Sequence, residues 1–188
     1  MKNLKLLVWS VICIFSFATM AAQTKKIDVS KSNINWIGKK ITGQHEGTIK
    51  FKEGSLTFKD NKVTDGNFTA DMKSLANTDQ TGSGKAKLEG HLKSDDFFGV
   101  YNFDTALLNF KTVTDKGNNT YTVIANLTIK GQTHPIIFDL VVKGNTATAT
   151  LKVDRTKYDI RYGSGSFFDD LGDKTIYDEF ELKVALVF

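Results

Sequence analysis

Cysteine is almost absent from this sequence of 188 residues. The single cysteine, Cys13, lies inside a mostly apolar run from Leu6 to Phe17, and no thiol remains after that run. This absence excludes a disulfide framework and a cysteine nucleophile in the rest of the chain. Stability must then come from an extensive hydrophobic core, which a chain of this size can form as one domain.

Excess charge of either sign is also missing. The formal net charge of +4 includes Lys2 and Lys5, so the chain without its first residues carries only +2. The remaining lysines are scattered along the sequence rather than clustered. Nucleic acid is therefore not expected as a partner, because such binding needs a concentrated basic surface.

Histidine is scarce, with only His45, His91 and His134 in the chain. The three lie in different segments, and no two are spaced as i and i+4 on a helix. This distribution favours neither a Ser/His/Asp triad nor a zinc site. We predict no catalytic set, no metal site and no cofactor.

A hydrophobic run long enough to span a membrane is lacking as well. The run from Leu6 to Phe17 falls short of the ~20 residues that a spanning helix needs. It follows Lys2 and Lys5 and precedes the small residues Ala21 and Ala22. This pattern predicts a secretory signal peptide over residues 1–22 rather than an uncleaved anchor, which leaves residues 23–188 as one exported domain. The predicted location is periplasmic or secreted.

Strand patterns are what the sequence does contain, and the clearest runs from Leu127 to Val142. Apolar residues alternate on both sides of a turn: Val123, Ala125, Leu127 and Ile129 before it, and Ile136, Phe138, Leu140 and Val142 after it. A period of two predicts two antiparallel strands that share one buried face. A Gly131-Gln132 turn would place the only proline, Pro135, where it must exchange hydrogen bonds with Thr128. We therefore expect a wider connection or a bulge near His134.

The rest of the chain repeats this alternation in short segments. The predicted strands and turns include residues 46–51 and 54–58, separated by a hairpin signal at Lys52 to Gly54, and residues 63–75, 105–113, 146–154 and 178–188. Eight or nine strands with one apolar face each close most easily as an antiparallel barrel or a two-sheet sandwich. Residues 85–92 predict a short helix with Leu88 and Leu92 facing inward, and residues 163–174 predict a loop.

Phenylalanine is abundant, with fourteen in the chain. Those at inward positions include Phe51, Phe58, Phe68, Phe110, Phe138 and Phe180. Any one of them is explained by an ordinary core. As a set they leave two alternatives: two sheets that fill the space between them, or an open barrel whose aromatic walls line a cavity for an apolar ligand.

Several segments in order resemble the signatures of the YceI-like family. They are GTIKFKEGSLTF (47–58), ADMKSLANTD (70–79), HLKSDDFF (91–98), YNFDTALLNF (101–110), LTIKGQTHPIIFDL (127–140) and DRTKYDIRYG (154–163). The resemblance covers nearly all of residues 23–188. One departure is Asp159, which follows Tyr158 where the family often has glycine.

The resemblance implies an all-β, extended, lipocalin-like antiparallel barrel of about eight strands with one short helix. It also implies an exported binding or carrier protein, not an enzyme, that holds a polyisoprenoid, an isoprenoid quinone or another long amphiphilic lipid in an apolar tunnel. A homodimer is left open. The candidate ligand-binding residues are Trp36, Phe51, Phe58, Phe68, Leu88, His91, Phe97, Phe98, Phe110, Leu127, Ile129, Ile136, Phe138, Leu140, Tyr158 and Phe180.

Two further expectations concern the mouth of this tunnel. Head-group specificity is assigned to His91, Asp95, Asp96 and Arg161, beside a covering made by residues 85–98 and 167–171. Two alternatives of other classes remain. One is a secreted hydrolase or isomerase that uses His91 with Asp95 and Asp96 as acid and base. The other is a filled β-sandwich that serves as an interaction subunit.

Overall fold

The computed structural model describes residues 21–188; most of the predicted signal peptide lies in residues 1–20, outside the described part. The described residues form nine strands, one α-helix and two 3-10 helices. In chain order these are β1 Gln23–Lys26, β2 Asn33–Lys40, β3 Gly43–Lys59, β4 Lys62–Asn77, α1 Gly82–Lys93, β5 Thr105–Gly117, β6 Thr120–Ile129, β7 Gln132–Lys143, β8 Thr146–Asp154, η1 Arg155–Tyr158, η2 Gly172–Lys174 and β9 Ile176–Val187.

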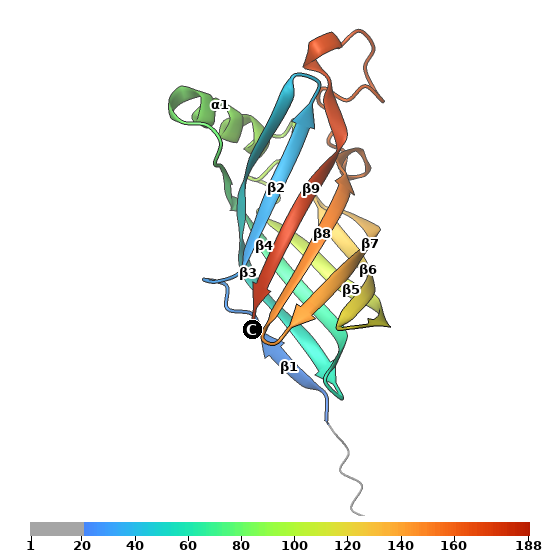
Figure 1. Cartoon of the computed structure of the whole chain (residues 1–188). Coiled ribbons are helices and arrows are strands. Elements are labelled where there is room, and N and C mark those ends of the chain that lie inside the picture. Colours follow the sequence, from blue (N-terminus) through green and yellow to red (C-terminus); the bar gives the residue numbers. More distant parts are fainter. Residues whose placement is uncertain (1–20) are drawn as a thin grey trace, which may run out of the picture.

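Eight of the strands close into one antiparallel barrel (Figure 1). The ring runs β3-β2-β9-β8-β7-β6-β5-β4, and β4 pairs with β3 again to close it. β1 pairs with the second half of β3, along the edge that β2 occupies further up. Closure gives most backbone groups of the strands a partner and leaves little exposed edge. The predicted extended antiparallel barrel of about eight strands is confirmed, and the two-sheet sandwich is not what forms.

The alternation in β6 and β7 produces the buried face that the sequence predicts. Val123, Ala125, Leu127 and Ile129 are all buried, and so are Ile136, Phe138, Leu140 and Val142 across the hairpin. Side chains on the other parity, such as Ile137, remain exposed. The hairpin is therefore one wall of the barrel, with its apolar row turned inward.

The turn of this hairpin corrects one prediction. The central residues are Lys130 and Gly131, with φ of 51° and 75°, and Ile129 pairs with Gln132. The register continues without a shift, so there is no bulge near His134. Moving the turn by one residue places Pro135 opposite Asn126, at a position that exchanges no hydrogen bonds with β6. The missing N–H of the proline costs nothing there.

The hairpin predicted at Lys52 to Gly54 is also wrong, because β3 continues through it as one strand. The register between β3 and β4 shifts between Phe51 and Glu53, which marks a bulge. A bulge bends a strand and increases its twist. Polar residues at this point therefore curve a long strand around the barrel instead of reversing the chain.

The single α-helix, α1, lies beside one end of the barrel (Figure 1) and is longer than the predicted segment 85–92. The Oε1 atom of Glu89 accepts a hydrogen bond from the backbone N–H of Asn77 at 2.8 Å, which ties the helix to the end of β4. Leu88 and Leu92 are half-buried and face the barrel interior. Among residues 21–188, no helix has the length and apolar character needed to cross a bilayer.

Candidate functional site

The barrel encloses a cavity of about 210 Å³ whose lining extends along β9 from Ile176 to Leu186. One water molecule needs ~10–15 Å³ of such space, so the cavity is far larger than a packing defect. All eight barrel strands contribute side chains to its wall, and most of these side chains are apolar. The interior is therefore an open site rather than a filled core over this part of the barrel.

Most of the candidate ligand-binding residues line this cavity. They are Trp36, Phe51, Phe68, Leu88, His91, Phe97, Phe98, Phe110, Leu127, Ile129, Phe138, Leu140 and Phe180. Phe51, Phe68, Phe110 and Phe138 form a continuous chain of rings across β3, β4, β5 and β7, with successive centroids about 6.0, 5.9 and 6.0 Å apart. Their contact with a ligand stays a prediction.

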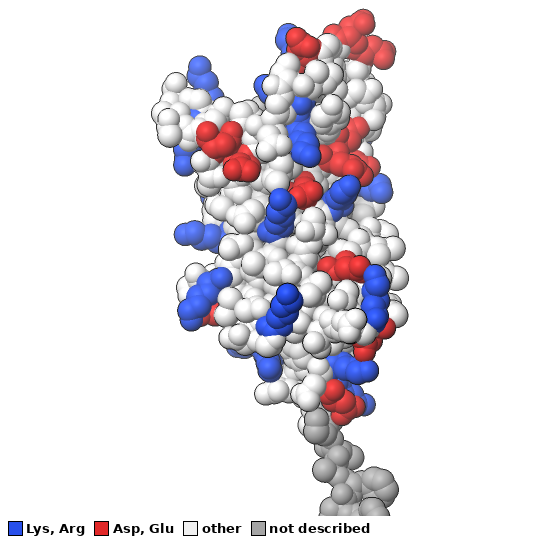
Figure 2. Space-filling view, in the orientation of Figure 1, with Lys and Arg blue, Asp and Glu red and all other residues white. Residues whose placement is uncertain are grey.

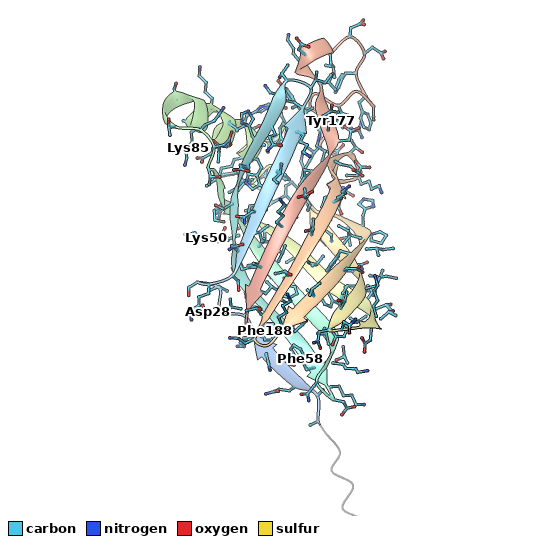
Figure 3. The ribbon with its side chains drawn as sticks, in the orientation of Figure 1. Asp28, Lys50, Phe58, Lys85, Tyr177 and Phe188 are labelled. Carbon is cyan, nitrogen blue, oxygen red and sulfur yellow. The ribbon has the colours of Figure 1, made fainter. Side chains whose placement is uncertain are left out.

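Phe58 is a candidate that does not line the cavity. Its ring packs on Phe188 with a centroid distance of 5.4 Å, and the Nζ of Lys25 lies 5.0 Å above it. Figure 3 places Phe58 and Phe188 together at the end of the barrel opposite Tyr177. The inward parity of Phe58 is as predicted, but at this end the side chains meet and close the barrel.

Ile136 and Tyr158 are the other two candidates outside the cavity wall. β7 pairs with β8 only over Leu140 to Lys143, and beyond this point η1 packs against β7. The ring of Tyr158 meets the ring of His134 edge to face at 5.3 Å. Both candidates are buried in the core, but neither side chain lines the cavity.

The mouth has an aromatic cluster that joins three segments distant in sequence. His91 from α1 lies edge-on to Phe97 at 5.0 Å and to Tyr162 at 4.4 Å. Phe98 in turn meets Phe180 of β9 at 6.1 Å. His91, Phe97 and Phe98 of the predicted covering segment 85–98 line the cavity. Phe167 and Phe168 of the other predicted covering segment are about half exposed and do not line the cavity.

The polar lining residues gather at this same end, and they differ from the predicted set. They are Lys39, Lys40, His45, His91, Arg155 and Tyr177. Of the four predicted mouth residues, His91 alone lines the cavity. Asp95, Asp96 and Arg161 are exposed, and Arg161 pairs with Asp159 at 3.0 Å. In this segment the basic residue that lines the cavity is Arg155, six residues before Arg161.

Arg155 is buried with 3% of its surface exposed, and it holds the mouth together through backbone carbonyls. Its Nε donates to the oxygen of Tyr177 at 3.1 Å, its Nη1 to Ile160 at 2.8 Å and its Nη2 to Ile176 at 3.0 Å. β8 pairs with β9 only as far as Glu179, so the first three residues of β9 lie beyond that ladder. Burial lowers the pKa of Arg155, which still leaves it charged at neutral pH.

Asp159, which stands where the YceI-like family often has glycine, still forms the local turn. Asp159 ends η1 with φ of 57° and ψ of 35°, the left-handed conformation that glycine adopts most easily. Aspartate and asparagine tolerate this region better than other residues. The backbone N–H of Asp159 donates to the carbonyls of Arg155 and Thr156, so the segment closes on itself.

His45 carries the other charged contact at the mouth. Its Nδ1 lies 2.8 Å from Oδ2 of Asp79, and the backbone N–H of Glu46 donates to Oδ1 at 3.0 Å. Asn77 also donates to this carboxylate. Burial by itself would raise the pKa of Asp79, but these hydrogen bonds outweigh it and lower the pKa to about 2. The carboxylate is therefore ionised and fully engaged.

The arrangement gives no support to the predicted acid-base alternative. Within residues 21–188 no hydrogen bond or ion pair joins His91 to Asp95 or Asp96, and the imidazole packs between aromatic rings instead. The same part of the chain brings no three His, Cys, Asp or Glu side chains together as metal ligands.

A second group of lining residues was not among the candidate ligand-binding residues. Most are small or aliphatic: Ile34, Ile49, Ala70, Met72, Leu75, Leu92, Ala106, Leu108, Ala149, Leu151, Ile176, Leu182, Val184 and Leu186. Many share the inward parity of the aromatic candidates on the same strands, so the period of two could have found them. No such signal marks Arg155 or Tyr177, because their position depends on where η1 and β9 meet.

A closed antiparallel barrel with an apolar internal cavity and a polar mouth defines a ligand-binding class of fold. The model of the YceI-like domain matches residues 26–188, and the chain belongs to this family. UPF0312 proteins from Shewanella denitrificans and Vibrio cholerae are 32% identical over 84 and 83 residues. These matches cover 45% and 40% of this chain, and the chain spans less than half the length of each relative, 42% and 44%.

Solved structures show the same fold. BcnA from Burkholderia cenocepacia superposes with a TM-score of 0.69 at 23% identity, covering 86% of this chain and 99% of that chain. A polyisoprenoid-binding domain from Saccharophagus degradans, implicated in plant cell wall breakdown, superposes with a TM-score of 0.57 at 15% identity. That match covers 89% of this chain and 97% of the domain. At these identities the likeness concerns the fold.

Proposed function

We propose that this protein is an exported carrier that binds a long amphiphilic lipid, a polyisoprenoid or an isoprenoid quinone, with the tail in the barrel cavity. The observation that carries the proposal is the cavity itself: a space of about 210 Å³ with an almost wholly apolar wall that ends in a polar mouth. Membership of the YceI-like family and the polyisoprenoid-binding neighbour support the same ligand class. No catalytic step is proposed.

The energetics of tail burial suit such a carrier. Transfer of one CH₂ group from water to an apolar site contributes about 0.8 kcal/mol. Several prenyl units therefore provide more gross free energy than the 4 to 15 kcal/mol, roughly, that association costs. Affinity follows from the length of the tail, so only a few polar groups are needed at the mouth.

Export is part of the proposal. An apolar tail must be shielded from water while it crosses the periplasm, and an exported carrier would provide this shield. The predicted signal peptide over residues 1–22 supports a periplasmic or secreted location for the domain 23–188. Mass spectrometry of the protein purified from its own host tests this, since cleavage near Ala22 would remove the mass of the first residues. Protein found only in the cytoplasmic fraction with an intact N-terminus would contradict it.

Ligand binding is tested by native mass spectrometry and by organic extraction of the protein from its own host. We expect an isoprenoid or a related amphiphile to co-purify. Trp36 is the only tryptophan in residues 23–188 and lines the cavity, so its fluorescence reports binding of added geranylgeraniol or a quinone. A protein that neither carries nor binds any such lipid would refute the proposal.

A variant with a larger side chain in the cavity tests whether the ligand binds there. Ala149 on β8 faces the cavity, whereas its neighbour Thr150 is exposed on the outer face. Ala149→Phe should weaken binding of geranylgeraniol by about tenfold or more, and Thr150→Phe should leave it within about twofold. Thermal unfolding confirms that both variants fold. Equal binding by the two would exclude the cavity as the ligand site.

A further inference from the structure

The polar end of the cavity carries basic side chains and, in the described part of the chain, no acidic ones. Lys39, Lys40 and Arg155 bring positive charge to the wall, and His45, His91 and Tyr177 complete its polar part. Among residues 21–188, no aspartate or glutamate lines the cavity. A site that had only to admit an uncharged head group would gain nothing from gathering cations at the end of an apolar wall, because desolvating charge costs free energy.

Two of these cations flank the same residue. Lys40 is the register partner of Ile176 in the β2–β9 ladder, and the carbonyl of Ile176 accepts a hydrogen bond from Nη2 of Arg155. The ladder is irregular at this point, since Gly38 pairs with Phe180 while Lys40 pairs with Ile176. The register pair and this hydrogen bond meet at Ile176, so the tertiary fold brings the two charged residues to one rim.

Little negative charge compensates them. Lys39 and Lys40 form no ion pair with any described residue, and Asp79 is occupied by His45. Arg155 has one acidic partner, Asp178 at 3.4 Å, which also accepts a hydrogen bond from Ser166 at 2.6 Å. Four of the five N–H donors of the guanidinium are used by Ile160, Ile176, Tyr177 and Asp178, so one on Nη1 is left for a ligand.

We propose that this rim, formed by Lys39, Lys40 and Arg155, is a head-group site for an anion, a phosphate monoester or a carboxylate, at the end of the bound tail. Phosphate and carboxylate oxygens accept the charge-assisted hydrogen bonds that ammonium and guanidinium groups donate. The inference rests on the proposed function, because the tail must occupy the cavity. Acidic residues of the loop 163–174, such as Asp169 and Asp173, are exposed and lie outside the wall.

The surface supports a local rather than a general preference for anions. Figure 2 shows Lys and Arg interspersed with Asp and Glu over the visible face, with acidic side chains at the tip that carries the loop before β9. A long-range field of one sign is therefore not what would attract the ligand. Recognition would come from contacts at the rim itself.

The experiment compares two ligands with the same tail, geranylgeranyl phosphate and geranylgeraniol, by Trp36 fluorescence of the whole protein after residue 22. We expect the phosphate to bind about three- to tenfold more tightly at low salt, with the difference shrinking as salt is added. Equal affinity for the two ligands would overturn the head-group site and leave the carrier function intact. Failure of both to bind would refute the carrier function instead.

A matched pair of double variants assigns the effect to the rim. Lys39→Gln with Lys40→Gln should remove most of the preference for the phosphate and leave geranylgeraniol binding within about twofold. Lys50→Gln with Lys52→Gln removes the same charge from exposed positions on the outside of β3 and should change neither affinity. Loss of the preference in the control pair alone, or in both pairs alike, would overturn the proposal.

Competition with inorganic phosphate tests whether the rim binds a lipid head group or a free anion. Because the tail supplies most of the binding free energy, inorganic phosphate at a concentration equal to that of geranylgeranyl phosphate should not displace it. Displacement at equal concentration would show that the rim selects free phosphate, and it would overturn the assignment to a lipid.

Discussion

The side chain of Arg155 donates from Nη2 to the backbone carbonyl of Ile176 across 3.0 Å, and so joins the end of β8 to the beginning of β9. The same guanidinium binds the carbonyls of Ile160 and Tyr177. Between these points the chain makes the long loop 161–175 at the mouth of the barrel (Figure 1). One buried side chain therefore fixes both ends of the loop and one side of the cavity entrance.

Replacement of Arg155 should lower stability more than any exposed charge does. Arg155→Met keeps much of the side-chain volume but leaves buried carbonyls without donors, at a cost of about 1–3 kcal/mol for each group that water does not reach. We expect the free energy of unfolding to fall by about 3 kcal/mol in urea denaturation.

The control for this change is Arg161→Met. Arg161 is exposed and makes a surface ion pair with Asp159, so its loss should cost no more than about 1 kcal/mol. Equal losses in the two variants would show that the carbonyl contacts of Arg155 do not hold the mouth.

The turn between β6 and β7 depends on a left-handed glycine. Gly131 has φ of 75°, and a Cβ there would lie 3.1 Å from the ring of Phe103. Gly131→Ala should therefore lower the free energy of unfolding by about 1–2 kcal/mol. Gly90, inside α1 with open space around it, is the matched control. Gly90→Ala should raise stability by about 0.5–1 kcal/mol, and a loss there as well would mean that the turn conformation is not the cause.

Stability should fall in acid through Asp79. Its folded pKa of about 2 lies below the ordinary value of 3.8, so the folded state binds this proton less readily than the unfolded state. The stabilisation is fully present above the unfolded pKa and is lost as the pH falls from about 4 through about 2. Because Asp79 is exposed and solvent screens its contacts, its contribution should be about 1 kcal/mol or less.

Urea denaturation at several pH values measures this dependence in the natural chain and in Asp79→Asn. The variant lacks the titrating group, so its stability should change less between pH 4 and pH 2, although it is less stable at neutral pH. An unchanged slope in the variant would show that other carboxyl groups, such as Asp28 with its pKa of about 2, cause the acid effect.

The period of two in the sequence was enough to predict much of the barrel and its wall. Phe51, Phe68 and Phe138 face inward because successive side chains on a strand alternate, and this holds whichever strands are neighbours. The same rule could not tell that Phe58 lies at the closed end, because parity gives the face of a strand and not the height along the barrel. Nor could it tell a bulge at Lys52 from a turn, since polar residues suit both.

Local spacing and composition are thus sufficient to predict an all-β fold, most of the strands and the apolar character of the interior. Which residues form the polar mouth depends instead on how distant segments pack together. Lys40, Arg155 and Tyr177 all line the cavity because β2, η1 and β9 converge at this end of the barrel. Lys40 and its register partner Ile176 are more than a hundred positions apart, and no local pattern records such a contact.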